Sequence, residues 1–245
     1  MPPRLHVDLP LHPDAELALP PGPARHVQVL RLQPGAALSL FDGSGGEFDA
    51  EVTAMGRSEV RVRVGAHRAV DRELPLAVTL AFGMPANERM DTLVEKATEL
   101  GVATIVPLVC ERSVLRLGGE RAEKKLAHWR GVATAACEQS GRAVLPVFEP
   151  VLALPAWLQS LPPPDAGARW LLSLGEAMPL AAAIAALGAR PASLSVLSGP
   201  EGGLSPAEEA LARRSGFAPV GLGPRTLRAD TAPLAVMAAL GLAAP

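Results

Sequence analysis

The sequence has no tyrosine, only 3% aromatic residues and only two cysteines among 245 residues. Its core therefore has to be built from leucine, valine and alanine, and the length is sufficient for two small domains or one large domain. Cys110 and Cys137 lie far apart in apolar segments and form no CxxC pair. We therefore expect buried structural thiols in a reducing, cytoplasmic environment.

Several classes of site are also missing. The five histidines are scattered without HxH or HExxH spacing, so we expect no metal. The chain contains neither a P-loop nor a GxSxG motif, and Gly221-x-Gly223 lacks the third glycine of a dinucleotide fingerprint. No apolar run approaches the length of a membrane span, and the N-terminus lacks the apolar segment of a signal peptide. We therefore expect a cytoplasmic protein with no membrane partner.

The formal net charge of −2 does not indicate a nucleic-acid-binding protein. Any RNA-binding surface has to be a local patch of arginines. For most individual arginines, the alternative interpretation is an ordinary solvated surface residue. Within residues 1–72, the segments 37–41, 47–54 and 60–64 predict short strands with a tight turn at Asp42–Gly46. These features predict a small β-barrel, and we place the domain boundary in the polar segment Asp71–Pro75.

The pattern changes after that boundary to alternating strands and helices. Strands are predicted at 76–82, 102–109, 144–148, 169–174, 194–197 and 218–222. Helices are predicted from 88 to Gly101, at 120–140, 151–161, 180–187 (ending at Gly188) and 205–216, and around 234–240. Pro162–Asp165 predicts a stiff linker. This alternation predicts a mainly parallel sheet covered on both faces in a second domain, residues 73–245.

The segment Ser195–Ala239 contains two glycine-bearing loops, each directly after a predicted strand. Between them, Ser205 and Glu208 have the spacing of a helix capping box. Loops of this kind at strand ends favour a ligand site, and two ordinary strand-to-helix connections are the alternative. The two charged residues of the second loop also have structural interpretations. Asp230 could cap the last helix, and Arg228 could be an ordinary surface cation.

Further segments support a resemblance. They are Leu197–Ser205, Leu222–Arg228, Lys96–Val102, Glu111–Ser113, Ala136–Arg142 and Phe41–Gly43. Taken in their order along the chain, they resemble the SPOUT methyltransferases, and most closely the RsmE family, which methylates N3 of a uridine in 16S ribosomal RNA. The resemblance implies a PUA-like barrel, a parallel α/β domain with a C-terminal trefoil knot, S-adenosylmethionine as cofactor, small-subunit ribosomal RNA as substrate, and a homodimer.

The resemblance also implies roles for individual residues. The cofactor-binding residues would be Leu174, Leu197, Gly199, Gly202, Gly221, Leu222 and Leu227. In the catalytic step, Arg228 would stabilise negative charge and Asp230 would act as base or orienting group. Phosphate contacts are expected from Arg4, Arg25, Arg31, Arg112 and Arg142.

The sequence differs from the family pattern at Ala229-Asp230-Thr231, where Thr-Glu-Thr is usual. This difference motivates one alternative, a non-catalytic protein for RNA binding or ribosome assembly. A second alternative is a SPOUT methyltransferase that acts on tRNA. Calorimetry with S-adenosylmethionine separates the first alternative from an enzyme.

Overall fold

The computed structural model describes residues 2–57, 59–163, 167–187 and 192–243. Contacts divide them into two units, residues 2–73 with 134–145, and residues 74–133 with 146–243. Residues 134–145, which the sequence-based division places in the second domain, thus group with the first unit. Two details of the sequence prediction, the linker residues 164–165 and the helix end at Gly188, lie outside the described residues.

The first unit contains a five-stranded sheet in the order β1-β3-β4-β5-β2. Its strands are β1 (Arg4–His6), β2 (Glu16–Ala18), β3 (Ala37–Phe41), β4 (Glu47–Met55) and β5 (Val60–Arg68), and its short helix is α1 (Pro21–Val29). Val62 is fully buried whereas its neighbours Arg61 and Arg63 are exposed, which confirms the predicted alternation. The sequence prediction missed β1 and β2, because three residues are too few to show a period.

The turn between β3 and β4 is stabilised locally. The Asp42 carboxylate accepts hydrogen bonds from the Ser44 backbone N–H (3.0 Å) and from Ser44 Oγ (2.6 Å). Gly43, Gly45 and Gly46 have positive φ angles of 86°, 115° and 70°, which residues with a Cβ rarely adopt. The structure thus confirms a hairpin turn between β3 and β4, which pair antiparallel.

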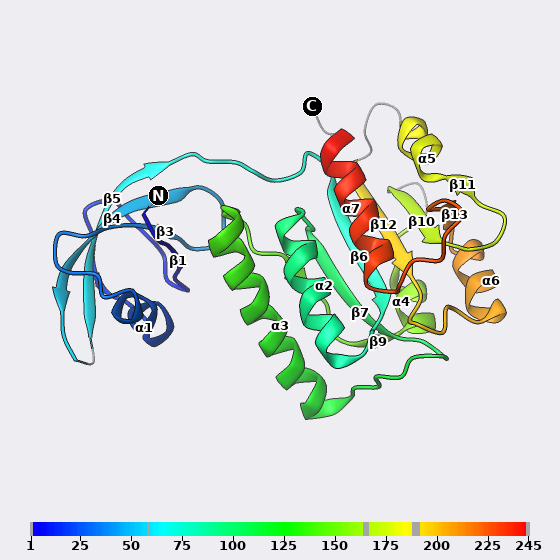
Figure 1. Cartoon of the computed structure of the whole chain (residues 1–245), viewed down its shortest axis with the longest axis horizontal. Helices are drawn as coiled ribbons and strands as arrows, with labels where there is room; N and C mark the ends of the chain where they lie inside the picture. Colours follow the sequence, from blue (N-terminus) through cyan, green and yellow to red (C-terminus); the bar gives the residue numbers. More distant parts are fainter. Residues whose placement is uncertain (1, 58, 164–166, 188–191, 244–245) are drawn as a thin grey trace. The chain divides into compact units, whose positions relative to one another are not determined.

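The second unit contains an eight-stranded sheet in the order β11-β13-β10-β12-β6-β7-β8, with β9 also paired to β7. Its strands are β6 (Ala77–Gly83), β7 (Thr104–Val109), β8 (Val147–Phe148), β9 (Leu152–Ala153), β10 (Ala168–Leu172), β11 (Met178–Pro179), β12 (Ser193–Ser198) and β13 (Ala218–Gly221). Every pairing is parallel, which confirms the predicted sheet (Figure 1). The strand predicted at 144–148 shortens to β8 because Pro146 has no N–H for the ladder.

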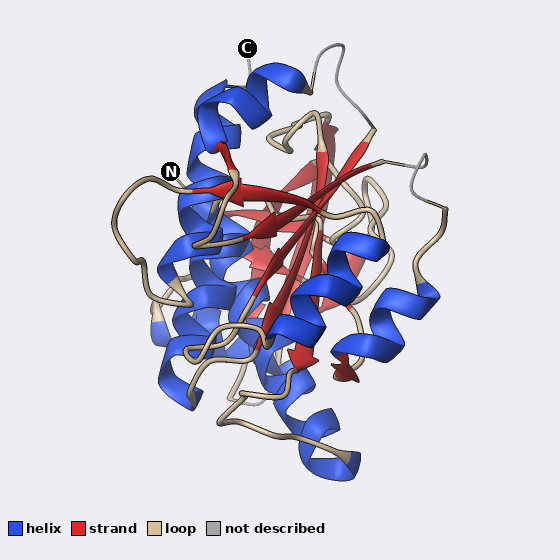
Figure 2. Ribbon diagram, turned by 90° about the vertical axis from the view of Figure 1, so that its right-hand side faces the viewer, coloured by secondary structure: helices blue, strands red, loops and turns tan. Residues whose placement is uncertain are grey.

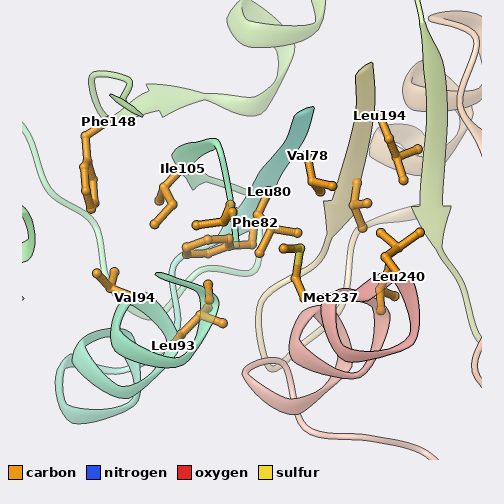
Figure 3. Close-up of a cluster of buried hydrophobic side chains, with 14 of the residues drawn as sticks. Val78, Leu80, Phe82, Leu93, Val94, Ile105, Phe148, Leu194, Met237 and Leu240 are labelled. Carbon is orange, nitrogen blue, oxygen red and sulfur yellow. The ribbon is translucent and has the colours of Figure 1, made fainter. Parts of the chain in front are cut away.

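Helices cover both faces of this sheet (Figure 2). Its helices are α2 (Asn87–Glu99), residues 119–133 of α3 (Gly119–Ser140), α4 (Leu154–Ser160), α5 (Leu180–Ala186), α6 (Pro206–Arg214) and α7 (Thr231–Ala243). On one face Val78, Leu80 and Phe82 point toward Leu93 of α2 and Met237 of α7 (Figure 3). The alternate strand residues pack with α4 and α6 on the other face. This period of two assigns alternate side chains of each buried strand to the two faces.

Candidate functional site

The predicted cofactor residues lie at the carboxyl ends of three neighbouring parallel strands. In the order β13-β10-β12, these strands lead into the loops 222–230, 173–177 and 199–205. Because parallel strands end at the same edge, the sheet brings these loops to one side, where open α/β sheets bind ligands. The residues at this edge are Leu174, Leu197, Gly199, Gly202, Gly221, Leu222 and Leu227.

The loop after β12 is too tightly folded to accept a side chain at its first glycine. Gly203 N–H donates to Pro200 O at 2.8 Å and closes the turn. A Cβ on Gly199 would lie 2.8 Å from Leu204 N and 2.9 Å from the Gly203 carbonyl carbon. Gly203 itself has φ of +68°. The loop therefore folds tightly on itself, which a residue with a Cβ at position 199 would prevent.

Loops after β6 and β7 brace this turn from outside. A Cβ on Gly83, the last residue of β6, would lie 2.6 Å from Pro200 N. The Ala86 N–H donates to Glu201 Oε1 at 3.0 Å, and Arg112 Nη1 donates to Gly202 O at 3.0 Å. Three neighbouring strand ends thus hold the loop in one position.

Glu208 is a further brace whose full role the sequence did not show. The capping box is confirmed, since Ser205 Oγ accepts from Glu208 N–H (3.3 Å) and Glu208 Oε2 accepts from Ser205 N–H (2.9 Å). The second oxygen, Oε1, accepts from Glu111 N–H at 2.8 Å in the loop after β7. The carboxylate is buried and joins two loops whose residues lie 97 positions apart, a contact that a local motif does not reveal.

The loop after β13 presents the two predicted catalytic residues. Arg228 is exposed, and its guanidinium pairs with no carboxylate among the described residues. Its backbone oxygen accepts from Thr231 N–H and Ala232 N–H, both at 3.0 Å, at the start of α7. Asp230 Oδ1 is buried and has no hydrogen-bond partner within the described part of the chain. A buried carboxylate oxygen without a donor is uncommon, and it is free to accept a proton or a hydrogen bond from a ligand.

The four leucines of the site differ in exposure. Leu174 is 78% exposed, and Leu222 and Leu227 are partly buried. Leu197 is fully buried in the apolar layer that contains α4 and α6, so its side chain is not available to cover a ligand. Only the backbone of Leu197 remains for the predicted role.

The structure contradicts two of the predicted phosphate contacts in the first unit. Arg4 donates to Cys137 O (2.7 Å), Glu138 O (3.2 Å) and Arg142 O (3.1 Å), and it pairs with the buried Glu47 at 2.9 Å. The Arg142 side chain is 3% exposed and pairs with Glu73. Both guanidinium groups thus stabilise protein structure: Arg4 lies at the last carbonyls of α3, where a cation is favourable, and Arg142 forms a buried ion pair with Glu73.

Arg25 and Arg31 are exposed in the first unit, as their predicted role requires. Arg112 is exposed as well, but it also donates to the loop after β12.

The two cysteines are buried, as predicted. Burial raises the pKa of the Cys110 thiol to about 12 and that of Cys137 to about 11. Among the described residues, no group of three or more histidine, cysteine, aspartate or glutamate side chains is placed to hold a metal ion. No helix in the described ranges has the length and apolarity needed to cross a membrane.

Comparison with known proteins now identifies the family. Residues 72–241 match the RNA methyltransferase domain family, and residues 24–65 match the RNA methyltransferase PUA domain. The chain is 33% identical over 218 residues to the ribosomal RNA small subunit methyltransferase E of Bacillus subtilis, a match that covers 87% of this chain and 84% of that protein.

Two solved structures are similar over nearly their whole length. One is a ribosomal RNA small subunit methyltransferase E from Neisseria gonorrhoeae bound to S-adenosyl methionine, with 35% identity, a TM-score of 0.89, and coverage of 98% of this chain and 97% of that one. The other is a methyltransferase from Legionella pneumophila in complex with the bound cofactor SAM, with 32% identity, a TM-score of 0.92, and coverage of 99% and 98%. Sequence, fold and site agree, and the chain belongs to the ribosomal RNA small subunit methyltransferase E (RsmE) family.

Proposed function

We propose that this protein transfers the methyl group of S-adenosylmethionine to N3 of a uridine in 16S ribosomal RNA. The observation that carries the proposal is the loop after β13, where an exposed arginine and a buried, unpartnered carboxylate oxygen lie two residues apart. Family membership and the relatives solved with S-adenosylmethionine support it. We place the reaction in the cytoplasm.

The residues at the sheet edge suit this cofactor. The turn from Gly199 to Gly203 leaves backbone groups accessible, and such groups are able to hydrogen-bond the edge of an adenine. Leu222 and Leu227 supply apolar surface for its faces, and the 78% exposed Leu174 supplies more. When bound, S-adenosylmethionine supplies an electrophilic methyl group.

The protein's own contribution is to prepare the uracil. N3 of uracil carries a proton that has to leave before the nitrogen acts as a nucleophile. Asp230 Oδ1 accepts that proton, directly or through a water molecule, and Arg228 stabilises the negative charge that develops on the ring. Most of the rate then comes from holding the two reactants in line, and the base has to be exposed from its stack.

We include the trefoil knot in the proposal. Strand β13 lies between β10 and β11, two strands that precede it and are joined by residues 173–177. The chain that leaves β13 reaches α7, which contacts α2 and β12 on one face of the sheet. This order, with β13 inserted between two strands that precede it, is compatible with the trefoil knot that the resemblance implies.

A homodimer is also part of the proposal. Helix α7 contains no charged residue, and Leu242 on it is 88% exposed. Met178 of β11 is 47% exposed. An exposed apolar surface suits contact with another chain. A second copy of this protein would cover them.

The test is the reaction itself. Purified protein is incubated with S-adenosylmethionine and with either small-subunit ribosomal RNA, assembled small subunits or tRNA, and the nucleosides are identified by mass spectrometry. We expect 3-methyluridine in the small-subunit RNA. Methylation of tRNA alone would show that tRNA is the substrate. Calorimetry that detects no S-adenosylmethionine binding would favour the non-catalytic alternative.

Variants in the second loop test the residue roles. Arg228→Ala should lower the rate constant of methyl transfer about 100-fold, as the loss of one charge-stabilising group typically does. The matched control is Arg225→Ala, an exposed arginine in the same loop. Asp230→Asn should lower the rate and leave the melting temperature nearly unchanged. Full activity with a lowered melting temperature would show that Asp230 only caps α7.

A further inference from the structure

The first half of α3 carries a row of cationic side chains that the sequence analysis did not single out. Arg121, Lys124, Lys125 and His128 have the spacing i, i+3, i+4 and i+7. At about 3.6 residues per turn, these positions share one face of the helix. We call these four residues the cationic stripe. The apolar face, with the buried Ala122, Leu126 and Trp129, packs toward the core.

The cationic stripe lines a concave surface. Together with Leu115 and Leu117 from the loop before α3, it encloses a hollow of about 400 Å³. The surface of this hollow is mostly apolar, and the side chains of Arg121, Lys124 and Lys125 contribute positive charge to it. That combination suits a phosphate backbone whose sugars or bases touch apolar side chains.

Few carboxylates neutralise the stripe. Lys124 lies 3.9 Å from the carboxylate of Glu120, whose side chain is 88% exposed, and an ion pair of that kind contributes little. His128 Nε2 lies 2.9 Å from Asp91 Oδ2, which fixes the orientation of the ring. Arg121 and Lys125 pair with no carboxylate among the described residues.

The stripe is connected to the candidate site through one loop. Residues 110–118 leave the carboxyl end of β7 and lead directly into α3. Arg112 in this loop donates to Gly202 O in the turn after β12. Figure 1 shows that α2 and α3 both begin on the side where β6 and β7 end. The stripe and the candidate site therefore lie in the same unit, and α3 begins at the edge of the sheet that carries the candidate site, where the parallel strands end.

We propose that the cationic stripe on α3 binds the phosphate backbone of the small-subunit ribosomal RNA that this protein methylates. The proposal rests on the proposed function, and it adds a substrate surface in the second unit to the arginines of the first. RNA is favoured over a protein partner because Arg121, Lys124 and Lys125 place three positive charges on one face of the helix, and phosphate oxygens complement such charges. Such contacts position the RNA and do not select its sequence.

The test compares two double variants that each remove two exposed cations. Arg121→Gln with Lys124→Gln removes half of the stripe. Arg213→Gln with Arg214→Gln changes α6, on the opposite face of the sheet, by the same net charge. Affinity for in vitro transcribed small-subunit ribosomal RNA is measured by filter binding from low to high salt, and S-adenosylmethionine affinity is measured by calorimetry.

Each phosphate contact contributes a slope of about −0.7 to −0.9 in a plot of log K against log salt concentration. Relative to 1 M salt, two contacts therefore raise the affinity about 25- to 60-fold at 0.1 M salt. We expect that loss and a shallower salt slope for the stripe variant alone, with unchanged S-adenosylmethionine affinity in both variants. Equal effects in the two variants would overturn the proposal, because they would show a general effect of charge. A loss seen with assembled subunits and absent with naked RNA would also overturn it, in favour of a protein contact.

The binding experiment also separates this proposal from the proposed function. If the wild-type protein forms no 3-methyluridine but the stripe variant alone loses RNA affinity, then the activity fails and the RNA surface stands. If methyl transfer proceeds and the stripe variant binds like the wild type, the surface fails alone.

Discussion

Gly199→Ala is the sharpest local test of the cofactor loop. The new methyl group would lie 2.8 Å from Leu204 N and 2.9 Å from the Gly203 carbonyl carbon, whereas ordinary contacts are 3.4–4 Å. Both neighbours are backbone atoms of the same turn, so the turn itself has to move by at least about 0.6 Å. Overpacking of this kind costs about 1–3 kcal/mol of folding stability.

The displaced turn should lower S-adenosylmethionine affinity at least about tenfold, which corresponds to about 1.4 kcal/mol. Calorimetry measures the affinity, and thermal denaturation measures the stability. The control is Gly131→Ala on the exposed side of α3, where a Cβ meets nothing within 4 Å. Alanine in a helix should raise the folding stability by about 0.5–1 kcal/mol over glycine. Wild-type affinity in the Gly199→Ala protein would refute the assignment of this turn to the cofactor.

Three further predictions concern stability and reactivity. Arg4→Ala should lower the free energy of unfolding by about 3 kcal/mol in denaturant titrations, because it leaves the buried Glu47 with one partner fewer. The control is Arg63→Ala, which removes an exposed ion pair 3.9 Å apart and should lower the free energy of unfolding by at most about 1 kcal/mol. Equal costs would contradict the structural role of Arg4. Glu208→Gln should lower the free energy of unfolding by about 1–3 kcal/mol and weaken S-adenosylmethionine binding. The carboxylate accepts from two backbone N–H groups, whereas the NH₂ group of glutamine cannot accept from either. Glu209→Gln is the control. The two thiols, whose pKa burial raises to about 12 and about 11, should resist alkylation at pH 8 in the native protein and react once it unfolds. Because the unfolded thiols ionise near pH 8.5, their contribution to stability should be complete below that pH and lost as pH rises through 11 to 12, which melting temperatures across this range would show.

The sequence was sufficient for features that depend on local patterns. The alternation at Val60–Val64 and the capping box at Ser205–Glu208 are each determined by neighbours in the chain, and the structure has both. The parallel sheet followed from the alternation of strands and helices. The glycine loops followed from glycine's freedom at positive φ and in close contacts, which the structure shows at Gly199 and Gly203.

Features that depend on distant partners could not be predicted in this way. Arg4 is one of the arginines from which phosphate contacts are expected, and the sequence does not show that its three carbonyl acceptors lie more than 130 residues away. Leu197 fits a ligand pocket by position, but the pleat of β12 turns its side chain into the core. The hollow beside the cationic stripe could not be predicted, because Leu115 and Leu117 belong to a loop whose position against α3 the sequence does not show.

The most direct test of the central claim uses ribosomal RNA from living cells. Small-subunit RNA is isolated from cells that lack this protein, from cells that carry it, and from cells that carry the Arg228→Ala variant, and its nucleosides are quantified by mass spectrometry. We predict that 3-methyluridine is present only with the wild-type protein and is strongly reduced with the variant. An unchanged level of 3-methyluridine in cells that lack the protein would contradict the proposed function.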